Sequence, residues 1–483
     1  MNVIEMLVFV AYFAFMLGIG MYFFLKSKNA GEKDYFLGGR NMGAWVSALS
    51  AGASDMSAWV LMGLPASIYA FGIGQTWIAI GLGIGYALSW VFMAPRLRRF
   101  SIEANDSITI PQYLTNRFLS TSKSLQVLCA GIFLVAYTVY AASSIKACGT
   151  LFNTVMNIDA TVAMYLAALI IIAYTFLGGF SAVCWTDFFQ GLIMLVALLL
   201  APIFALALVS QGQGAANTQL PDGFFHLFTS PQDIISGLGW GLGYFGMPHI
   251  IIRFMSIRSE KELRKSSVIG ISWTVIILVM SALTAVAGRL YLGEIEDSST
   301  VFITMVRQIF PALVSGLLLS AILSAAMSTA DSQLLAASSA FASDVYKPLI
   351  HKNVSDREML WVSRLVVAAI AVVALMIASN PNSGTIMGLV ENAWGVFGAA
   401  FGPVILLSLF WRKLTFGGTV AGIAVGAGVD VLWLLLASAT GIYEIVPGFI
   451  AGLIAAVVVS MLSKQGPGAE VEALFDRASQ QEA

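Results

Sequence analysis

An apolar segment near the N-terminus is interrupted by polar residues; it reads Ser47-Ala-Leu-Ser-Ala-Gly-Ala-Ser-Asp-Met-Ser-Ala-Trp59 and then reaches Gly63 and Pro65. An ionised aspartate at the centre of a membrane helix costs about 2.5–3.5 kcal/mol even on a lenient insertion scale. We therefore expect Asp55 to face a polar partner or a wet cavity. The Ser and Asp side chains also compete for backbone hydrogen bonds, which predicts an unwound turn within residues 52–57. The alternative is that Asp55 only caps the end of a broken helix.

The composition places this segment in a membrane protein. Of the 483 residues, 58% are hydrophobic and 11% are charged, whereas a soluble domain is about 25% charged. The 25 basic residues are balanced by 26 acidic ones, so no basic surplus indicates a nucleic-acid partner. The few cysteines and histidines are too scattered to predict a disulfide framework or a metal cluster: Cys129, Cys148, Cys184, His226, His249 and His351.

Thirteen segments are apolar enough to cross a bilayer, which takes about 20 residues of helix. No small-residue cleavage site follows the first of them, so we interpret it as a span and not as a signal peptide. We predict one all-α transmembrane domain over residues 1–483, with a short polar tail at 464–483 that is frayed. The predicted spans are 4–25, 43–65, 75–95, 124–151, 160–177, 185–209, 233–254, 267–292, 311–338, 360–378, 386–411, 417–440 and 443–462.

The distribution of Lys and Arg predicts the orientation, because basic residues concentrate in inner loops. With the N-terminus outside and the C-terminus inside, all basic residues except Arg289, Arg307 and Lys146 fall on the inner side, Lys28 and Arg253 among them. Moving one span boundary would destroy this asymmetry.

The seventh predicted span is also interrupted. It contains Gly237-Leu-Gly-Trp-Gly-Leu-Gly-Tyr-Phe-Gly-Met-Pro248, whose five glycines and one proline disfavour a continuous helix. Its glycines satisfy a GxGxxG pattern, but the strand–turn–helix context of a dinucleotide site is missing. Trp240 and Tyr244 stand four residues apart and would form an aromatic wall on any helical portion; the alternative is that they are packed core aromatics.

The ninth predicted span carries hydroxyls at a spacing of four: Ser320, Ser324, Ser328 and Ser332, with Thr329 and Asp331 beside them. Residues four apart share a helix face. This ladder predicts an oxygen-rich path for a small hard cation. For Ser320 we favour ordinary helix packing.

The second and seventh spans lie five apart in order and cross in opposite directions. Interrupted helices at corresponding positions of two inverted halves indicate a transporter binding site. We therefore predict repeats over about 43–209 and 233–411, with 4–25, 417–440 and 443–462 as peripheral helices. Four GxxxG pairs, beginning at Gly81, Gly398, Gly422 and Gly448, predict close helix packing.

Three of these segments closely resemble one known family. They are Ser50-Ala-Gly-Ala-Ser-Asp-Met-Ser-Ala-Trp-Val-Leu-Met-Gly-Leu-Pro65, Trp240-Gly-Leu-Gly-Tyr-Phe-Gly-Met-Pro-His249 and Leu319-Ser-Ala-Ile-Leu-Ser-Ala-Ala-Met-Ser-Thr329. The chain is similar to bacterial sodium/proline symporters of the sodium/solute symporter family, which have the LeuT-type 5+5 inverted-repeat fold. The likeness extends through residues 37–40, 178–187, 401–403 and 443–448, and so covers nearly the whole chain.

The resemblance implies two sites. The sodium site would use backbone oxygens of Ala53, Met56 and Ala325 and the hydroxyls of Ser328 and Thr329, with Asp55 supporting it electrostatically. The solute L-proline would be bound by Ser57, Trp59, Gly63, Tyr140, Trp240, Tyr244 and Pro248.

Five further residues concern ion movement. The resemblance places Asp187 near the inner ion-release route, where relatives with a second sodium combine it with hydroxyls of the ninth span; here Ser324 and Ser332 would support that path. Asp331 and Lys146 depart from the family pattern. We expect Lys146 to snorkel to the outer edge, about 9 Å of helix from Tyr140; an inward-pointing ammonium would put strict sodium dependence in doubt.

The expected function is uptake of L-proline driven by inward sodium movement through the bacterial inner membrane, by alternating access and without an organic cofactor. The partners would be the solute and membrane lipid, while the oligomeric state stays open. The alternatives are sodium- or proton-coupled transport of another small solute, a channel through the hydroxyl ladder, or a membrane-embedded enzyme. The sequence contains no HExxH motif or other catalytic set that favours the enzyme.

Overall fold

The computed structural model describes residues 2–26, 32–177, 179–215, 220–464 and 466–480. Lys28, Gly178 and parts of the C-terminal tail, which entered the sequence analysis, lie outside these residues. The described residues are helices and loops, with a single bridge between Met42 and Ile257. The main helices are α1 (Val3–Lys26), α2 (Glu32–Leu37), α3 (Ala44–Asp55), α4 (Gly63–Phe71), α5 (Thr76–Leu88), α6 (Ala94–Glu103), α7 (Ile110–Arg117), α8 (Ser124–Met156), α9 (Ala160–Leu177), α10 (Phe180–Ser210), α11 (Pro231–Gly239), α12 (Pro248–Ser256), α13 (Glu260–Leu292), α14 (Val301–Ile309), α15 (Ala312–Phe341), α16 (Asp356–Ser379), α17 (Ile386–Phe410), α18 (Phe416–Leu436), α19 (Ile445–Leu462) and α20 (Ala469–Ser479).

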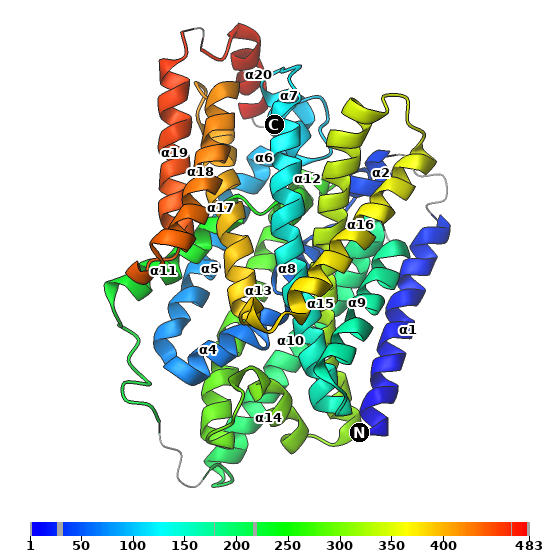
Figure 1. Ribbon diagram of the computed structural model, residues 1–483, viewed down its shortest axis with the longest axis vertical. Coiled ribbons are helices and arrows are strands. Elements are labelled where there is room, and N and C mark those ends of the chain that lie inside the picture. The colour runs from blue at the N-terminus through cyan, green and yellow to red at the C-terminus, as the bar shows by residue number, and fades with distance from the viewer. Residues whose placement is uncertain (1, 27–31, 178, 216–219, 465, 481–483) are drawn as a thin grey trace.

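Within the described residues, ten helices are long and apolar enough to cross a membrane. They run roughly along the long axis of the molecule, with the start of α1 and the helix α20 near opposite ends (Figure 1). The other three predicted spans coincide with α3–α4, α9 and α11–α12, which are interrupted or offer a shorter apolar stretch. The structure therefore confirms an all-helical, multi-pass membrane protein, and the count of thirteen spans stays a prediction.

Both predicted interruptions are present, and their positions are now defined. The helix α3 continues to Asp55, and the break falls at Met56 and Ser57 before the short 3-10 turn η2 (Ala58–Val60). The break thus lies within the predicted residues 52–57, although Gly52 itself is still helical and lies close to the Trp273 ring. In the seventh span, η5 (Trp240–Phe245) is a 3-10 segment between α11 and α12.

The helix α15 positions the first interruption. It is buried along most of its length and packs against α1, α3, α8 and α10. The helix α12, which follows the second interruption, packs against both α3 and α15. The two broken helices and α15 therefore meet in the interior of the bundle.

The glycine pairs act as predicted, by allowing backbones to touch. A Cβ on Gly81 would lie 2.2 Å from the carbonyl oxygen of Gly237, and one on Gly85 would lie 2.2 Å from that of Gly241. The helix α5 is thereby pressed against α11 and η5. A Cβ on any glycine of the pairs in α17, α18 and α19 would lie 2.2–3.0 Å from a neighbouring atom, which confirms their packing role.

We expected the C-terminal tail to be frayed, but part of it is helical. Its residues 469–479 form α20, which buries Val471, Leu474 and Phe475 against the bundle. The Phe475 ring meets Phe100 of α6 at 5.3 Å between centroids. The tail was predicted to fray because it is polar overall, but its apolar residues recur at helical spacing and cover one face.

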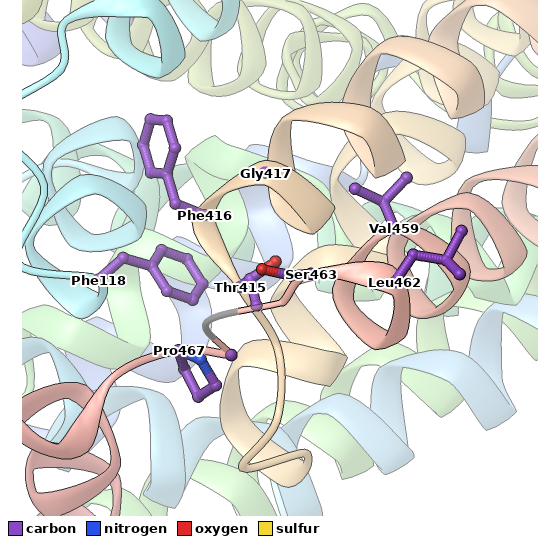
Figure 2. Close-up of a pocket in the computed structure, with 9 residues that line it drawn as sticks. Phe118, Thr415, Phe416, Gly417, Val459, Leu462, Ser463 and Pro467 are labelled. Atoms are coloured by element: carbon purple, nitrogen blue, oxygen red, sulfur yellow. The ribbon is translucent and has the colours of Figure 1, made fainter.

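A surface pocket lies beside the connection from α19 to α20 (Figure 2). It is lined by residues from the start of α18, the end of α19 and the loop after α7, including the Phe118 and Phe416 rings at 6.3 Å. None of the predicted site residues lines it. The pocket therefore plays no part in the site described below.

The contact between Gly85 and Gly241 generates a prediction. Gly85→Ala should lower the melting temperature of the purified protein, because a backbone carbonyl cannot yield as a flexible side chain would; overpacking costs about 1–3 kcal/mol. Gly131→Ala in α8 is the matched control, since a Cβ there meets nothing within 4 Å. Equal melting temperatures for the two variants would contradict the proposed contact.

Candidate functional site

The break after α3 exposes a backbone carbonyl to α15. Because the Ser57 amide donates to the Asp55 carbonyl, the Ala53 carbonyl oxygen lacks its usual helical donor. It accepts instead from the Ser328 hydroxyl at 2.8 Å, and the same hydroxyl lies 3.2 Å from the Ala325 carbonyl. Three of the five expected sodium ligands therefore touch one another.

The other two expected ligands lie beside this contact. Thr329 follows Ser328 in α15, is fully buried, and its hydroxyl has no hydrogen-bond partner among the described residues. Met56 is fully buried at the break. Ala53 and Ser328 thus bring oxygen atoms from two helices into contact, and oxygen atoms are the ligands that hard cations prefer.

A hydrogen bond joins the two interrupted helices directly. The Tyr244 hydroxyl, from η5, donates to Asp55 Oδ2 at 2.5 Å. Asp55 is fully buried, and its Oδ1 has no partner among the described residues. Asp55 is therefore more than a helix cap, because its carboxylate faces the second interruption.

Trp240 and Tyr244, the predicted aromatic wall, are buried in a larger cluster of aromatic rings, and their role in binding a solute stays a prediction. The Tyr244 ring lies 5.1 Å from both Trp394 of α17 and Tyr86 of α5. Trp240 lies 5.0 Å from Tyr443, and the Trp394 indole donates to the Trp240 carbonyl at 2.8 Å. Sequence reasoning missed Tyr86, Trp394 and Tyr443, since aromatic residues in apolar helices carry no distinguishing pattern.

The remaining expected solute residues surround the break in α3–α4. The Tyr140 hydroxyl, from α8, lies near Ser57 and Trp59. The Trp59 indole donates to the Asp55 carbonyl at 3.2 Å. Gly63 begins α4 and Pro248 begins α12, so each stands where its helix resumes.

Asp187 is engaged by a residue that we did not predict. Arg253, counted above with the basic residues of the inner side, is buried within α12 and places Nη2 3.1 Å from Asp187 Oδ2. The same Nη2 donates to the Ser332 hydroxyl at 2.6 Å, and the Ser50 hydroxyl donates to Asp187 Oδ2 at 2.6 Å. The signal in the sequence was an arginine within the apolar run of residues 250–255.

Asp331 belongs to the same network. It is fully buried, and Oδ1 accepts from the Ser332 hydroxyl at 3.3 Å. Four helices (α3, α10, α12 and α15) therefore meet around one buried arginine and two buried aspartates. The fixed guanidinium supplies a positive charge to Asp187 within the expected ion path.

The hydroxyls of α15 face different neighbours. The Ser320 hydroxyl bonds to the Gly316 carbonyl of its own helix, which agrees with its packing role. Ser324 lies near Tyr12 of α1, whereas Ser328 and Ser332 meet α3 and α12. Successive steps of the ladder thus contact different helices.

Lys146 and His249 make their hydrogen bonds outside the contact between Ala53 and Ser328. The Lys146 ammonium lies 3.2 Å from the Ser383 hydroxyl and bonds to the Gly384 carbonyl, so it reaches the connection between α16 and α17. The backbone amide of His249, which was missed as a site residue, donates to the Tyr137 hydroxyl oxygen at 2.9 Å, and His249 Nε2 lies 3.1 Å from the Ser54 carbonyl oxygen. It links α12 to α8 and α3.

A charged cluster outside the membrane spans closes one end of this core. Arg40 Nε lies 2.8 Å from Asp106 Oδ1, and Arg40 also donates to the Met255 carbonyl at 2.6 Å. Burial alone would raise the pKa of Asp106, but hydrogen bonds from Lys33 and Arg40 lower it below its ordinary value. The loop before α3 is thereby tied to the end of α12.

Solved structures share this architecture. A Na⁺-coupled sialic acid symporter in a substrate-bound, outward-open state matches with a TM-score of 0.76 and 22% identity, covering 96% of this chain and 98% of that one. Mhp1, a nucleobase-cation-symport-1 family transporter, matches with a TM-score of 0.57 and 14% identity over 92% and 98%. These matches show a LeuT-like helical fold, and the two interrupted helices of this chain lie in its interior.

Sequence comparisons define the family. The model of the sodium:solute symporter family matches residues 35–426. The high-affinity proline transporter PutP of Bacillus subtilis is 42% identical, over 95% of this chain and 98% of its own. The osmoregulated proline transporter OpuE of the same organism is 43% identical over 94% of each, and the sodium/proline symporter of Haemophilus influenzae is 40% identical over 98% and 97%.

The chain therefore belongs to the sodium:solute symporter family. This membership confirms the resemblance found in the sequence and the prediction of a transporter in place of an enzyme.

The buried ion pair generates the next prediction. Arg253→Gln should lower the melting temperature strongly, because removing one partner leaves Asp187 as an unpaired buried charge, at a cost of about 3–5 kcal/mol. Combining it with Asp187→Asn should recover part of the loss. The control is Arg412→Gln, which removes the two ion pairs of an arginine that is 50% exposed and should cost at most about 1 kcal/mol.

The double variant is the decisive comparison. If the losses from Arg253→Gln and Asp187→Asn simply add, the two side chains do not interact in the folded protein.

Proposed function

We propose that this protein carries L-proline into the cell together with sodium ions, and that the break after α3 binds both. One observation carries the proposal: the Ala53 carbonyl, freed by the break, faces the Ser328 hydroxyl of α15, in a chain whose near-full-length relatives are named as proline transporters. Another small solute of the same family, or coupling to protons, is the alternative.

The sodium ion would lie between α3 and α15. Its ligands would be the backbone oxygens of Ala53, Met56 and Ala325 and the hydroxyls of Ser328 and Thr329. Binding would replace the present bond from Ser328 to Ala53 with two bonds to the cation. Asp55 would lower the cost of bringing a positive charge into the apolar interior.

The proline site would lie on the other side of the same break. Proline is a zwitterion with an apolar ring, so its site needs dipoles and aromatic surfaces. Freed amides and the Ser57 hydroxyl would hold the carboxylate, beside Gly63 and Pro248, the first residues of the helices that resume after the two breaks. The pyrrolidine ring would pack between the aromatic rings of Trp59, Tyr140, Trp240 and Tyr244.

Coupling follows from the shared break. A cation between α3 and α15 would fix the shape of residues 56–59, so each ligand would raise the affinity of the other by the same factor. Rocking of the two repeats would then expose the site to each side in turn. The driving force is the sodium gradient plus about 2.3 kcal/mol per charge for each 100 mV of membrane potential.

We further propose the finer architecture predicted from the sequence. The chain forms a single transmembrane domain with thirteen spans, inverted repeats at about 43–209 and 233–411, and peripheral helices 4–25, 417–440 and 443–462. It lies in the bacterial inner membrane with its N-terminus outside and residues 464–483 in the cytoplasm. Asp187, Ser324 and Ser332 would line or support the inner ion path, and no organic cofactor is required.

Uptake of radiolabelled proline into proteoliposomes tests the proposal as a whole, with sodium, lithium and proton gradients imposed separately. Uptake driven by sodium alone is expected. Uptake driven equally by a proton gradient without sodium would favour the alternative coupling. Exchange of external for preloaded proline would exclude a simple pore.

The ion site is tested by Ser328→Ala and Thr329→Ala. Each variant should raise the sodium concentration for half-maximal uptake by about tenfold, the equivalent of about 1.4 kcal/mol for one lost ligand. Ser320→Ala is the matched control, since its hydroxyl bonds within its own helix. Unchanged sodium dependence in both site variants would remove this ion site.

The aromatic wall is tested by Trp240→Ala. Proline binding at saturating sodium should weaken by about tenfold, because the ring would lose its packing surface. Trp45→Ala, which removes a ring that is 62% exposed, should leave the affinity unaltered. Equal affinities for the two variants would show that the wall lies elsewhere.

A further inference from the structure

Two acidic side chains meet behind the aromatic wall, at the junction of α17, α18 and α19. Asp430 lies in α18 and is 1% exposed; Glu444 caps the start of α19 and is 6% exposed. Both lie against Gly395 of α17, where a Cβ would stand 2.8 Å from Asp430 Oδ1 and 3.3 Å from Glu444 Cγ. The glycine leaves the space that the two carboxyl groups occupy.

These carboxyl groups lack the partners that buried acids normally have. Neither oxygen of Asp430 nor Oε1 of Glu444 has a hydrogen-bond partner among the described residues. No ion pair in that part of the chain includes either residue. Two neighbouring carboxylates cannot both stay ionised cheaply in apolar surroundings, so such pairs bind a proton.

The pair is connected to the predicted proline site through its neighbours in the chain. Gly395 follows Trp394, whose indole donates to the Trp240 carbonyl. Glu444 follows Tyr443, whose ring lies 5.0 Å from that of Trp240. Movement of the Glu444 carboxyl group would therefore reach Trp240 through Tyr443, and movement of the Asp430 carboxyl group would reach it through Gly395 and Trp394.

We propose that Asp430 and Glu444 form a proton-binding site that sets the affinity for the solute through Trp394 and Tyr443. With one proton bound, the pair stays compact and the two aromatic residues hold Trp240. When the proton leaves to solvent at higher pH, a second negative charge drives the carboxylates apart and loosens the wall. Solute affinity should then fall as the pH rises.

The surroundings favour a proton over a metal ion. The other titratable groups facing the pair are Glu391 of α17 and the Tyr443 hydroxyl, which donates to the Glu391 carbonyl at 2.8 Å. The one charged side chain of α11 and η5, Asp233, is bonded to Ser230. Among the described residues, no three His, Cys, Asp or Glu side chains are placed to hold a metal ion.

The first experiment reads the proton directly and does not depend on proline transport. Infrared spectra of the purified protein are recorded from about pH 5 to about pH 9, for the wild type, Asp430→Asn and the exposed control Glu296→Gln. The wild type and control should show a protonated carboxyl band that shrinks as pH rises, and Asp430→Asn should lack that component. If Asp430→Asn does not fold, Glu444→Gln replaces it in the same measurement, because Glu444 stands at the end of a helix.

Two results would overturn the site. One is identical bands in the wild type and both pair variants; the other is a band removed by sodium at constant pH, which would make the ligand a metal ion.

The effect on the solute rests on the function proposed above. The dissociation constant of radiolabelled proline at saturating sodium should rise at least about fivefold with pH in the wild type, and stay level in Asp430→Asn and Glu444→Gln. A level wild-type profile would refute the coupling, whereas no proline binding at any pH would refute the proposed function and leave the infrared test intact.

Discussion

A peptide group inside a membrane must be hydrogen-bonded by protein, because lipid offers it no partner. The carbonyl of Ala53 faces this requirement where α3 ends, and a side chain from another helix meets it. The carbonyl of Asp55 is met by the Ser57 amide and the Trp59 indole, and the Asp55 carboxylate by Tyr244. The interruption is therefore possible only because α15 and η5 surround it, and the close glycine contacts of α5 hold η5 in place.

The same requirement explains why the break is suited to binding. Oxygen atoms that accept hydrogen bonds from neighbouring side chains in the ligand-free protein can bind a ligand when those hydrogen bonds are replaced. A bond from Ser328 to Ala53 is weak compared with coordination of a cation, so exchange between them costs little. Ser332 lies one turn after Ser328 in α15, and it accepts a hydrogen bond from the buried Arg253 of α12, which also pairs with Asp187. The charge of Asp187 is therefore balanced by a fixed protein group and does not require a bound cation.

Much of this could be predicted from residue patterns. The composition and apolar runs predicted the helical membrane protein, and the glycines and proline of residues 237–248 predicted the second interruption. The first was predicted within residues 52–57 from the Ser and Asp side chains, and the structure places it at Met56 and Ser57, while Gly52 stays helical with Trp273 packed against it. The tail was interpreted from its polarity, and the apolar face that docks α20 on α6 was overlooked.

What the sequence by itself determined is the set of elements that are local in origin. Apolar length makes a helix that can span the bilayer, and closely spaced glycines prevent one from continuing. What only the tertiary structure decided is which side chain meets each freed or charged group: Ser328 for Ala53, Tyr244 for Asp55, Arg253 for Asp187. These partners stand between 66 and 275 residues apart, and no local pattern encodes such a pairing, because it depends on how the helices pack and not on their periodicity.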